Sequence, residues 1–296
     1  MKQHNQFKKI KSSNSSETKT VSKFSYVFLW SVLFSLSFTS CLDVIEVDLE
    51  EATPRVVIDA ALQWERDTDG NIQEIKVSKT RGFFDDTPSF IENAFVQIED
   101  EEGNVFSFEE VEAGIYRTEN FQPILNRRYF LSVEAEGEVF ESEEVMTSVP
   151  TIAGIEQTDD GGFAGGQNEV RVFFEDPAGE ENFYLFKFFV DFLAFPDFTV
   201  LTDEFIDGNV SSVSFSDEDL EVGDVVTVQM HGISRSYYNF LFRLLAQTGA
   251  AGGPFQAQPA TVRGNIVNKT NDNNFAFGYF SLSEMIEIEV EVGAEN

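Results

Sequence analysis

Apolar and polar residues alternate through much of the chain in short segments, and this pattern predicts β-strands. Six such segments lie in the first half: RVVIDAAL (55–62), EIKVSK (74–79), AFVQIE (94–99), NVFSF (104–108), RYFLSVEA (128–135) and EVFESEEV (138–145). Glycine next to acidic or amide residues marks tight hairpin turns in three of the gaps: DTDGN (67–71), DEEGN (100–104) and AEGE (135–138). Short strands at this spacing predict an all-β sandwich that is immunoglobulin- or transthyretin-like.

A second block of alternation begins after the glycine-rich segment TDDGGFAGGQN (158–168). Its predicted strands are EVRVFFE (169–175), FYLFKFFVDFL (183–193), DVVTVQMH (224–231), FAFGYFSLS (275–283) and MIEIEVEV (285–292). In the last run the aliphatic residues face one way and the glutamates the other, which predicts a half-buried strand. The glycines predict a strand-free loop, so we expect two β-sandwich-like domains in tandem, 54–150 and 151–296, separated near Pro150.

One segment of the second domain has a helical period. In SRSYYNFLFRLLAQTG, Ser234 can cap the start and Gly249 can end the helix, which predicts a helix near 235–247. Its apolar stripe consists of Tyr237, Leu241, Leu244 and Leu245, widened by Tyr238 and Phe242. We expect this stripe to pack against the second sheet rather than to bind a partner.

The N-terminus has the pattern of an exported protein. Six lysines and one glutamate precede an uncharged run from Phe24 to Cys41, and acidic residues follow that run. This polarity keeps the N-terminus inside and sends the remainder across a membrane. The most apolar part, 27–38, is shorter than the roughly 20 residues of a membrane span. Small residues stand directly before Cys41, as a cleavage site requires.

These features resemble a bacterial lipoprotein signal, in which the cysteine is acylated and the chain is cut before it. We therefore expect a signal peptide over 1–40, lipidation of Cys41 and an acidic tether over 41–53. Two or three acyl chains hold a protein on a bilayer where one chain alone is marginal. The alternative is an uncleaved signal-anchor helix, which the short apolar run and its serines disfavour.

Removal of residues 1–40 takes away six of 20 basic and one of 52 acidic residues, which leaves a formal charge of −37. A surface this acidic excludes nucleic acid as a partner, because counterion release needs basic groups. Without a cysteine besides Cys41, no disulfide can brace the mature chain. Its stability must come from ordinary hydrophobic cores, for which 27 phenylalanines supply large apolar area.

Motifs for catalysis or metal binding are lacking, so we expect no catalytic residue, metal site or cofactor. One histidine, His231, remains after removal of the signal, which is too few for a common zinc site. A triad with Ser214 or Ser234 is formally possible, but no G-x-S-x-G elbow exists, and we expect His231 to face solvent at a strand end. Carboxylates are too many to single out a hydrolytic pair. DTDGN and SDEDLEVGD (216–224) are interpreted as solvated turns rather than calcium loops.

Four segments together resemble a family of lipoproteins: CLDVIEVDLEE (41–51), PRVVIDAAL (54–62), DPAGEENFYLFKF (176–188) and PATVRGNIVNKTNDNNFAFGYFSLS (259–283). The family is the Bacteroidota outer-membrane lipoproteins with domain of unknown function 4249. The most specific parts are G-N-I at 264–266 and F-G-Y-F at 277–280. The resemblance implies an outer-membrane location and a gene encoded near those of TonB-dependent receptors, and it implies no reaction.

Two classes of function follow from these observations. The first is a non-catalytic accessory or binding lipoprotein of a TonB-dependent uptake system, and the alternative is an outer-membrane or cell-surface hydrolase that uses Asp or Glu carboxylates. The nearly uncharged segment TGAAGGPFQAQPATVRGN (248–265) makes Phe255 a candidate contact with a transporter. The alternative for Phe255 is simple burial under a surface loop.

Overall fold

The computed structural model describes residues 53–82, 85, 87, 89–248 and 261–293, which form fifteen strands and one helix. The strands of the first half are β1 (Val56–Glu65), β2 (Gln73–Lys79), β3 (Phe95–Asp100), β4 (Val105–Glu112), β5 (Ile115–Thr118), β6 (Arg128–Ala135) and β7 (Glu138–Val145). The second half contains β8 (Thr151–Gly161), β9 (Gln167–Glu175), β10 (Phe183–Phe189), β11 (Asp197–Thr202), β12 (Val210–Ser216), β13 (Val225–Gly232), α2 (Arg235–Thr248), β14 (Val267–Asn268) and β15 (Phe277–Glu291). The all-β prediction with a single helix in the second half is confirmed for the described residues.

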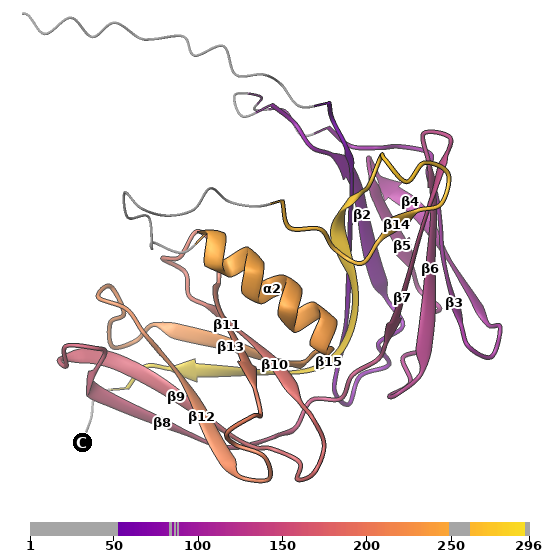
Figure 1. Ribbon diagram of the computed structural model, residues 1–296. Coiled ribbons are helices and arrows are strands. Elements are labelled where there is room, and N and C mark those ends of the chain that lie inside the picture. Colours follow the sequence, from indigo (N-terminus) through magenta and orange to yellow (C-terminus); the bar gives the residue numbers. More distant parts are fainter. Residues whose placement is uncertain (1–52, 83–84, 86, 88, 249–260, 294–296) are drawn as a thin grey trace, which may run out of the picture. The chain divides into compact units, whose positions relative to one another are not determined.

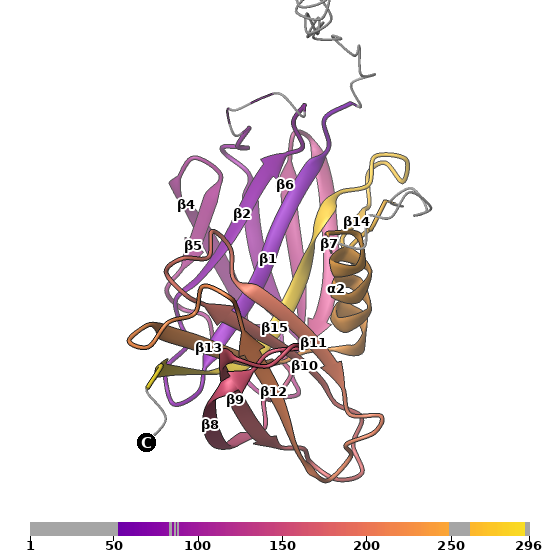
Figure 2. The same cartoon turned by 90° about the vertical axis from the view of Figure 1, so that its left-hand side faces the viewer.

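Twelve strands form one sheet in the order β11-β10-β13-β15-β1-β2-β5-β4-β3-β6-β7-β14, and three form a second in the order β12-β9-β8. The long sheet turns at β4, whose first half pairs with β3 and whose second half pairs with β5. At the centre, β1 and β15 run parallel, from Val57 opposite Phe277 to Glu65 opposite Met285, and they lie side by side in Figure 2. Strands from the two ends of the chain therefore share backbone hydrogen bonds.

Two hydrophobic cores lie within this arrangement. The first is built by β1 to β7 and includes Ile58, Val96 and Tyr129. The second lies between the three-stranded sheet and the β10–β13–β15 part of the long sheet, and includes Phe174 and Phe186. Alternation explains both, because successive residues of a strand face opposite sides and only one side faces each core.

The strand β15 contributes to both cores, which the sequence did not predict. Residues 275–292 were expected to form two strands, whereas the structure has one continuous strand, Phe277–Glu291. Phe280 and Leu282 belong to the first core, and Val290 belongs to the second. The predicted alternation at its end is confirmed, with the glutamates exposed. Separate unfolding of the domains 54–150 and 151–296 stays a prediction, and β15 now joins their cores.

The prediction of a strand-free loop over 158–168 is wrong. These residues form the turn of the β8–β9 hairpin, and strand pairing extends to Gly161 opposite Gln167. Gly162 and Gly166 adopt positive φ angles of 76° and 77°, which residues other than glycine adopt at a cost. The glycines therefore make a tight turn between strands, and β8 escaped prediction because most of its residues are exposed on both faces.

The predicted helix is confirmed as α2, and it lies against β10 and β11 of the long sheet (Figure 1). The Oγ of Ser234 accepts a hydrogen bond from the backbone N–H of Tyr237 at 3.2 Å, which is the expected N-cap. Leu241 is buried and forms a small cluster with Phe183 and Leu185 of β10. The helix therefore packs through Tyr237, Tyr238 and Leu241 of the predicted stripe, whereas Phe242 and Leu244 of that stripe are exposed.

Candidate functional site

The two site residues that the sequence nominated, Cys41 and Phe255, lie outside the described residues, as do residues 41–52 of the predicted tether and residues 249–260 of the segment around Phe255. Lipidation of Cys41 and partner contact through Phe255 therefore stay predictions. Within the described residues, no helix combines the length and the hydropathy that crossing a membrane requires.

The prediction that His231 faces solvent is wrong, because this side chain is buried on β13. Its ring nitrogens lie 3.4 Å from Ser283 Oγ and 3.3 Å from Gln229 Oε1. Burial lowers the pKa of His231 well below its ordinary range, and the charge of Lys187 lowers it further. The imidazole is therefore neutral at physiological pH, and within the described residues neither ring nitrogen hydrogen-bonds to a carboxylate, as a triad would require. Ser234, one of the two serines named for a triad, caps helix α2.

The two most specific sequence motifs lie against each other and form a structural clasp. The side-chain amide of Asn265 donates to the carbonyl of Phe280 at 2.8 Å and accepts from its N–H at 2.9 Å. A Cβ on Gly264 would lie 1.7 Å from the carbonyl oxygen of Gly278. Gly278 itself has a φ of 96°, and a Cβ there would lie 1.9 Å from the carbonyl oxygen of Ile58. These glycines allow backbones to approach closely, so the motif residues fix the fold at the β1–β15 pair.

An ion pair between the buried Glu284 and the partly exposed Arg66 links the two halves of the chain. Glu284 of β15 is almost fully buried and accepts two hydrogen bonds from Arg66, each at 2.9 Å. The same carboxylate accepts the N–H of Val149 at 2.9 Å, and Arg66 also donates to the carbonyl of Val149. A charge in this position needs such partners, since an unpaired buried carboxylate is strongly unfavourable. The group is therefore structural.

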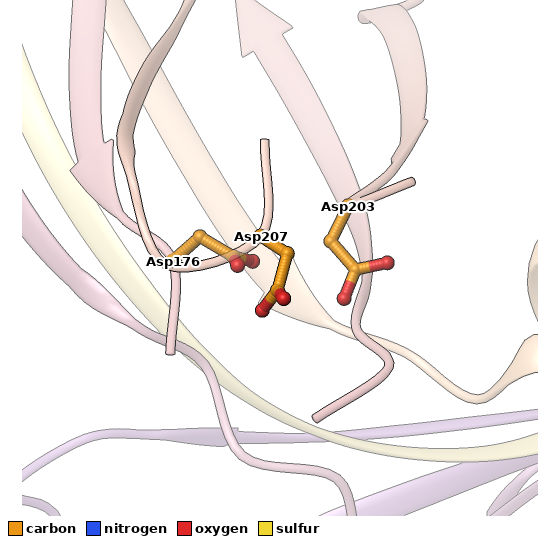
Figure 3. Close-up of side chains that lie close together, drawn as sticks. All are labelled: Asp176, Asp203 and Asp207. Carbon is orange, nitrogen blue, oxygen red and sulfur yellow. The ribbon is translucent and has the colours of Figure 1, made fainter. Parts of the chain in front are cut away.

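Three carboxylates, Asp176, Asp203 and Asp207, point toward one another at one end of the second core (Figure 3). Their ligand oxygens lie within 4.8 Å of one another, and Asp176 and Asp203 are buried. Carboxylate oxygens are the ligands that Ca²⁺ and Mg²⁺ prefer, so these three could hold a divalent cation. Sequence reasoning missed them because they come from the end of β9 and from the β11–β12 loop.

Each of these carboxylates also has a role in closing its loop. The N–H of Gly208 donates to Asp176 at 2.9 Å, the N–H of Asn182 donates to Asp203 at 2.6 Å, and that of Gly179 donates to Asp207 at 2.7 Å. The hydroxyl of Tyr184 donates to Asp176. Burial raises the pKa of Tyr184, and the Asp176 carboxylate raises it further. The cluster thus has a sufficient structural explanation as a set of loop caps.

The other acidic turns considered in the sequence are turns in the structure too. In DTDGN, between β1 and β2, the indole of Trp64 donates to the carbonyl of Thr68 at 2.9 Å and Asp67 has a positive φ. In the segment before β13, Asp217 and Asp224 accept backbone N–H groups of Asp219 and Glu221, each at 2.9 Å. Both interpretations as turns are confirmed.

The fold and its side chains define a class: an acidic, mostly β protein with two cores joined by one long strand. Within that class, the chain belongs to the family described as domain of unknown function DUF4249, whose model matches residues 43–287. The clasp motifs at 264–266 and 277–280 lie inside the matched range. No curated protein matches the chain.

Solved structures with some similarity include fibronectin-type and receptor domains. A segment of two fibronectin type III domains from chicken tenascin is 13% identical over 61% of this chain and 91% of that chain, with a TM-score of 0.21. A cytokine receptor complex is 9% identical over 80% of this chain and 97% of that chain, with a TM-score of 0.25. The chicken interferon gamma receptor alpha chain is 11% identical over 61% and 89%, with a TM-score of 0.21. At these TM-scores the similarity carries no functional argument.

Proposed function

We propose that this protein is a non-catalytic outer-membrane lipoprotein of a Bacteroidota bacterium, held by lipid on Cys41, and that it acts as an accessory or binding subunit of a TonB-dependent uptake system. The observation that carries the proposal is the order of segments around Cys41. A basic stretch, a short apolar run and small residues precede Cys41, and the family match begins two residues after it, at residue 43. This is the order in which a lipoprotein signal precedes a mature domain.

Physical chemistry supports an anchor made of lipid rather than of surface charge. A mature chain with a formal charge of −37 is repelled by anionic head groups. Acyl chains on Cys41 overcome this repulsion, because each buried methylene contributes about 0.8 kcal/mol. An anchored protein is also confined to two dimensions, which raises its effective concentration near a membrane partner without high intrinsic affinity.

Substitution of the cysteine tests the anchor. Cys41→Ser should abolish labelling by an alkyne fatty-acid analogue and leave the chain as an unprocessed precursor or release it from membranes. The intact mass of wild-type protein should show that residues 1–40 are absent and acyl chains present. Wild-type protein that keeps those residues and takes no label would establish the signal-anchor alternative instead.

Recovery of a transporter tests the partnership. Wild-type protein purified in gentle detergent should recover a TonB-dependent transporter, and Phe255→Asp should weaken that recovery while the thermal midpoint stays nearly unchanged. The matched control is Phe163→Asp, since Phe163 is fully exposed at the β8–β9 turn. Equal recovery by both variants, or a large loss of stability in Phe255→Asp, would remove the case for Phe255. Absence of a transporter even with wild-type protein would overturn the partnership itself.

An activity screen tests whether the protein is non-catalytic. The purified protein should show no turnover of glycosidic or peptide substrates. Robust turnover that Asp176→Asn abolishes would favour the hydrolase, because Asp176 belongs to the carboxylate cluster of the described residues. Turnover that is unchanged by every carboxylate substitution would point to a contaminating enzyme.

A further inference from the structure

A groove lies on the face of the long sheet that carries α2. It has a volume of about 510 Å³ and is lined by β1, β2, β10, β11 and α2. On β10 the even-numbered residues Tyr184 and Phe186 enter the second core, so Leu185 and Lys187 face the opposite side and line the groove. The groove thus lies where strands from both halves of the chain meet the helix.

Lys187 is the least exposed of the charged side chains that line this groove. Glu74 pairs with Arg117, and Asp59 stands directly opposite Lys76 in the β1–β2 register. The side chain of Lys187 has no ion pair and no hydrogen bond within the described part of the chain, although the charge of Asp59 acts on it. Its ammonium group is therefore available to an incoming anion.

The surroundings of Lys187 also favour the binding of an anion to its ammonium group. Burial lowers the pKa of Lys187 to about 8, and the charge of Asp59 partly opposes this effect. The amine is still mostly charged at pH 7, and a buried charge without a partner is unfavourable. His231 on the neighbouring strand stays neutral, and burial raises the pKa of Tyr237 on α2 to about 12. Neither competes for an anion as a second charge.

The apolar lining of the groove indicates what else the ligand should carry. Ile72 and Phe198 are 59% and 37% exposed, which leaves apolar surface facing the groove beside Leu185 and Leu241. A ligand with a hydrophobic body would cover this surface while its charge meets Lys187. A dianion such as phosphate fits less well, because Asp59 and Glu74 also line the groove and would repel a second negative charge.

We propose that this groove binds a small organic carboxylate, with the carboxylate on the ammonium group of Lys187 and the apolar body against Phe198, Leu185 and Leu241. The groove lies wholly within residues 52–296, which form one compact unit containing both cores. The proposal therefore goes beyond the lipoprotein function and does not depend on the anchor or on a transporter.

Calorimetric titration of the compact unit 52–296 tests this proposal with four named probes: benzoate, octanoate, inorganic phosphate and uncharged benzyl alcohol. We expect at least one carboxylate to bind, and phosphate and benzyl alcohol to bind at least about tenfold more weakly. Lys187→Met should weaken carboxylate binding by about tenfold or more. The matched control Lys76→Met, which removes an exposed amine of the same groove, should change it by less than about twofold.

The pH dependence gives a second readout. Carboxylate affinity should be constant between about pH 6 and 7.5 and should fall about tenfold per pH unit once Lys187 loses its proton. The other charged groups that line the groove are Asp59, Glu74 and Lys76, and Tyr237, whose pKa burial raises to about 12, keeps its proton over this range. Equal binding by Lys187→Met and wild-type, or no binding of either carboxylate at millimolar concentration, would overturn the proposal. Phosphate binding as tight as that of the carboxylates would make this an inorganic-anion site and overturn the ligand class.

Discussion

Replacement of Lys187 by methionine should stabilise the protein, whereas most substitutions in strands destabilise. Methionine keeps an unbranched apolar side chain in place of the lysine stem and removes an ammonium group that has no close partner among the described residues. Burial lowers the pKa of Lys187 to about 8 from an ordinary 10.5. At roughly 1.4 kcal/mol for each pKa unit, this difference corresponds to about 3 kcal/mol of unfavourable free energy in the folded state at pH 7.

The sign of this effect sets its pH dependence. Below about pH 8 the amine is charged in both the folded and the unfolded chain, so the folded state bears the full penalty. Between about pH 8 and 10.5 the unfolded chain holds a proton that the folded chain has released, so the penalty shrinks as pH rises. The gain from Lys187→Met should therefore be about 3 kcal/mol at pH 7 and close to zero above pH 10.5.

Urea unfolding followed by far-UV circular dichroism at pH 7, 9 and 10.5 measures this gain. Lys76→Met is the matched control: its amine is exposed, and both variants remove one positive charge from an acidic chain, so both change self-repulsion equally. We expect the control to stay within about 0.5 kcal/mol of wild-type. Equal free energies of unfolding for the two variants at pH 7, or a gain that persists at pH 10.5, would refute this reasoning.

Three further variants test the structural groups. Asn265→Ala should lower the free energy of unfolding by about 2–3 kcal/mol, because it leaves two backbone groups of β15 unpaired; urea midpoints measure this loss, and an unchanged midpoint would contradict the clasp. Gly278→Ala should lower the free energy of unfolding by several kcal/mol more than Gly103→Ala, because both glycines have a positive φ but an added Cβ clashes with backbone only at Gly278. Equal thermal midpoints of the two variants would count against this packing. Glu284→Gln should lower the free energy of unfolding by about 3 kcal/mol at pH 7, because it leaves Arg66 without its charge partner. A loss below about 1 kcal/mol would show that the pair is well solvated.

Local pattern was enough to predict strands that bury one face. The bounds of β6 and β7 agree with the predicted 128–135 and 138–145 because their side chains alternate cleanly between core and solvent. Five strands escaped prediction: β5, β8, β11, β12 and β14. Two of them lack this signal, because β8 is exposed along most of its length and β5 has only four residues. Helix α2 was predictable because its stripe has a helical period and Ser234 supplies the cap.

Pattern was not enough where the partner lies far away in the chain. β15 was divided into two strands at Glu284, because a charge between apolar runs is typical of a break. The structure pairs this charge with Arg66, which is 218 positions away in the sequence. The same limit hid the Asp176 cluster and the burial of His231, since neither follows from neighbouring residues. Tertiary contacts decided all three.

The sequence of β10 does contain the signal for the groove, although its meaning needs the structure. In FYLFKFF every residue except Lys187 is aromatic or aliphatic, so the strand is built to be buried on both faces. Leu185 on the same face shows that an apolar side chain fits there, and an apolar residue at 187 would stabilise the fold. Natural proteins sacrifice stability at places where function requires a particular group. A lysine that weakens its own strand, faces a groove and lacks a close partner is therefore better explained by what it binds than by what it stabilises.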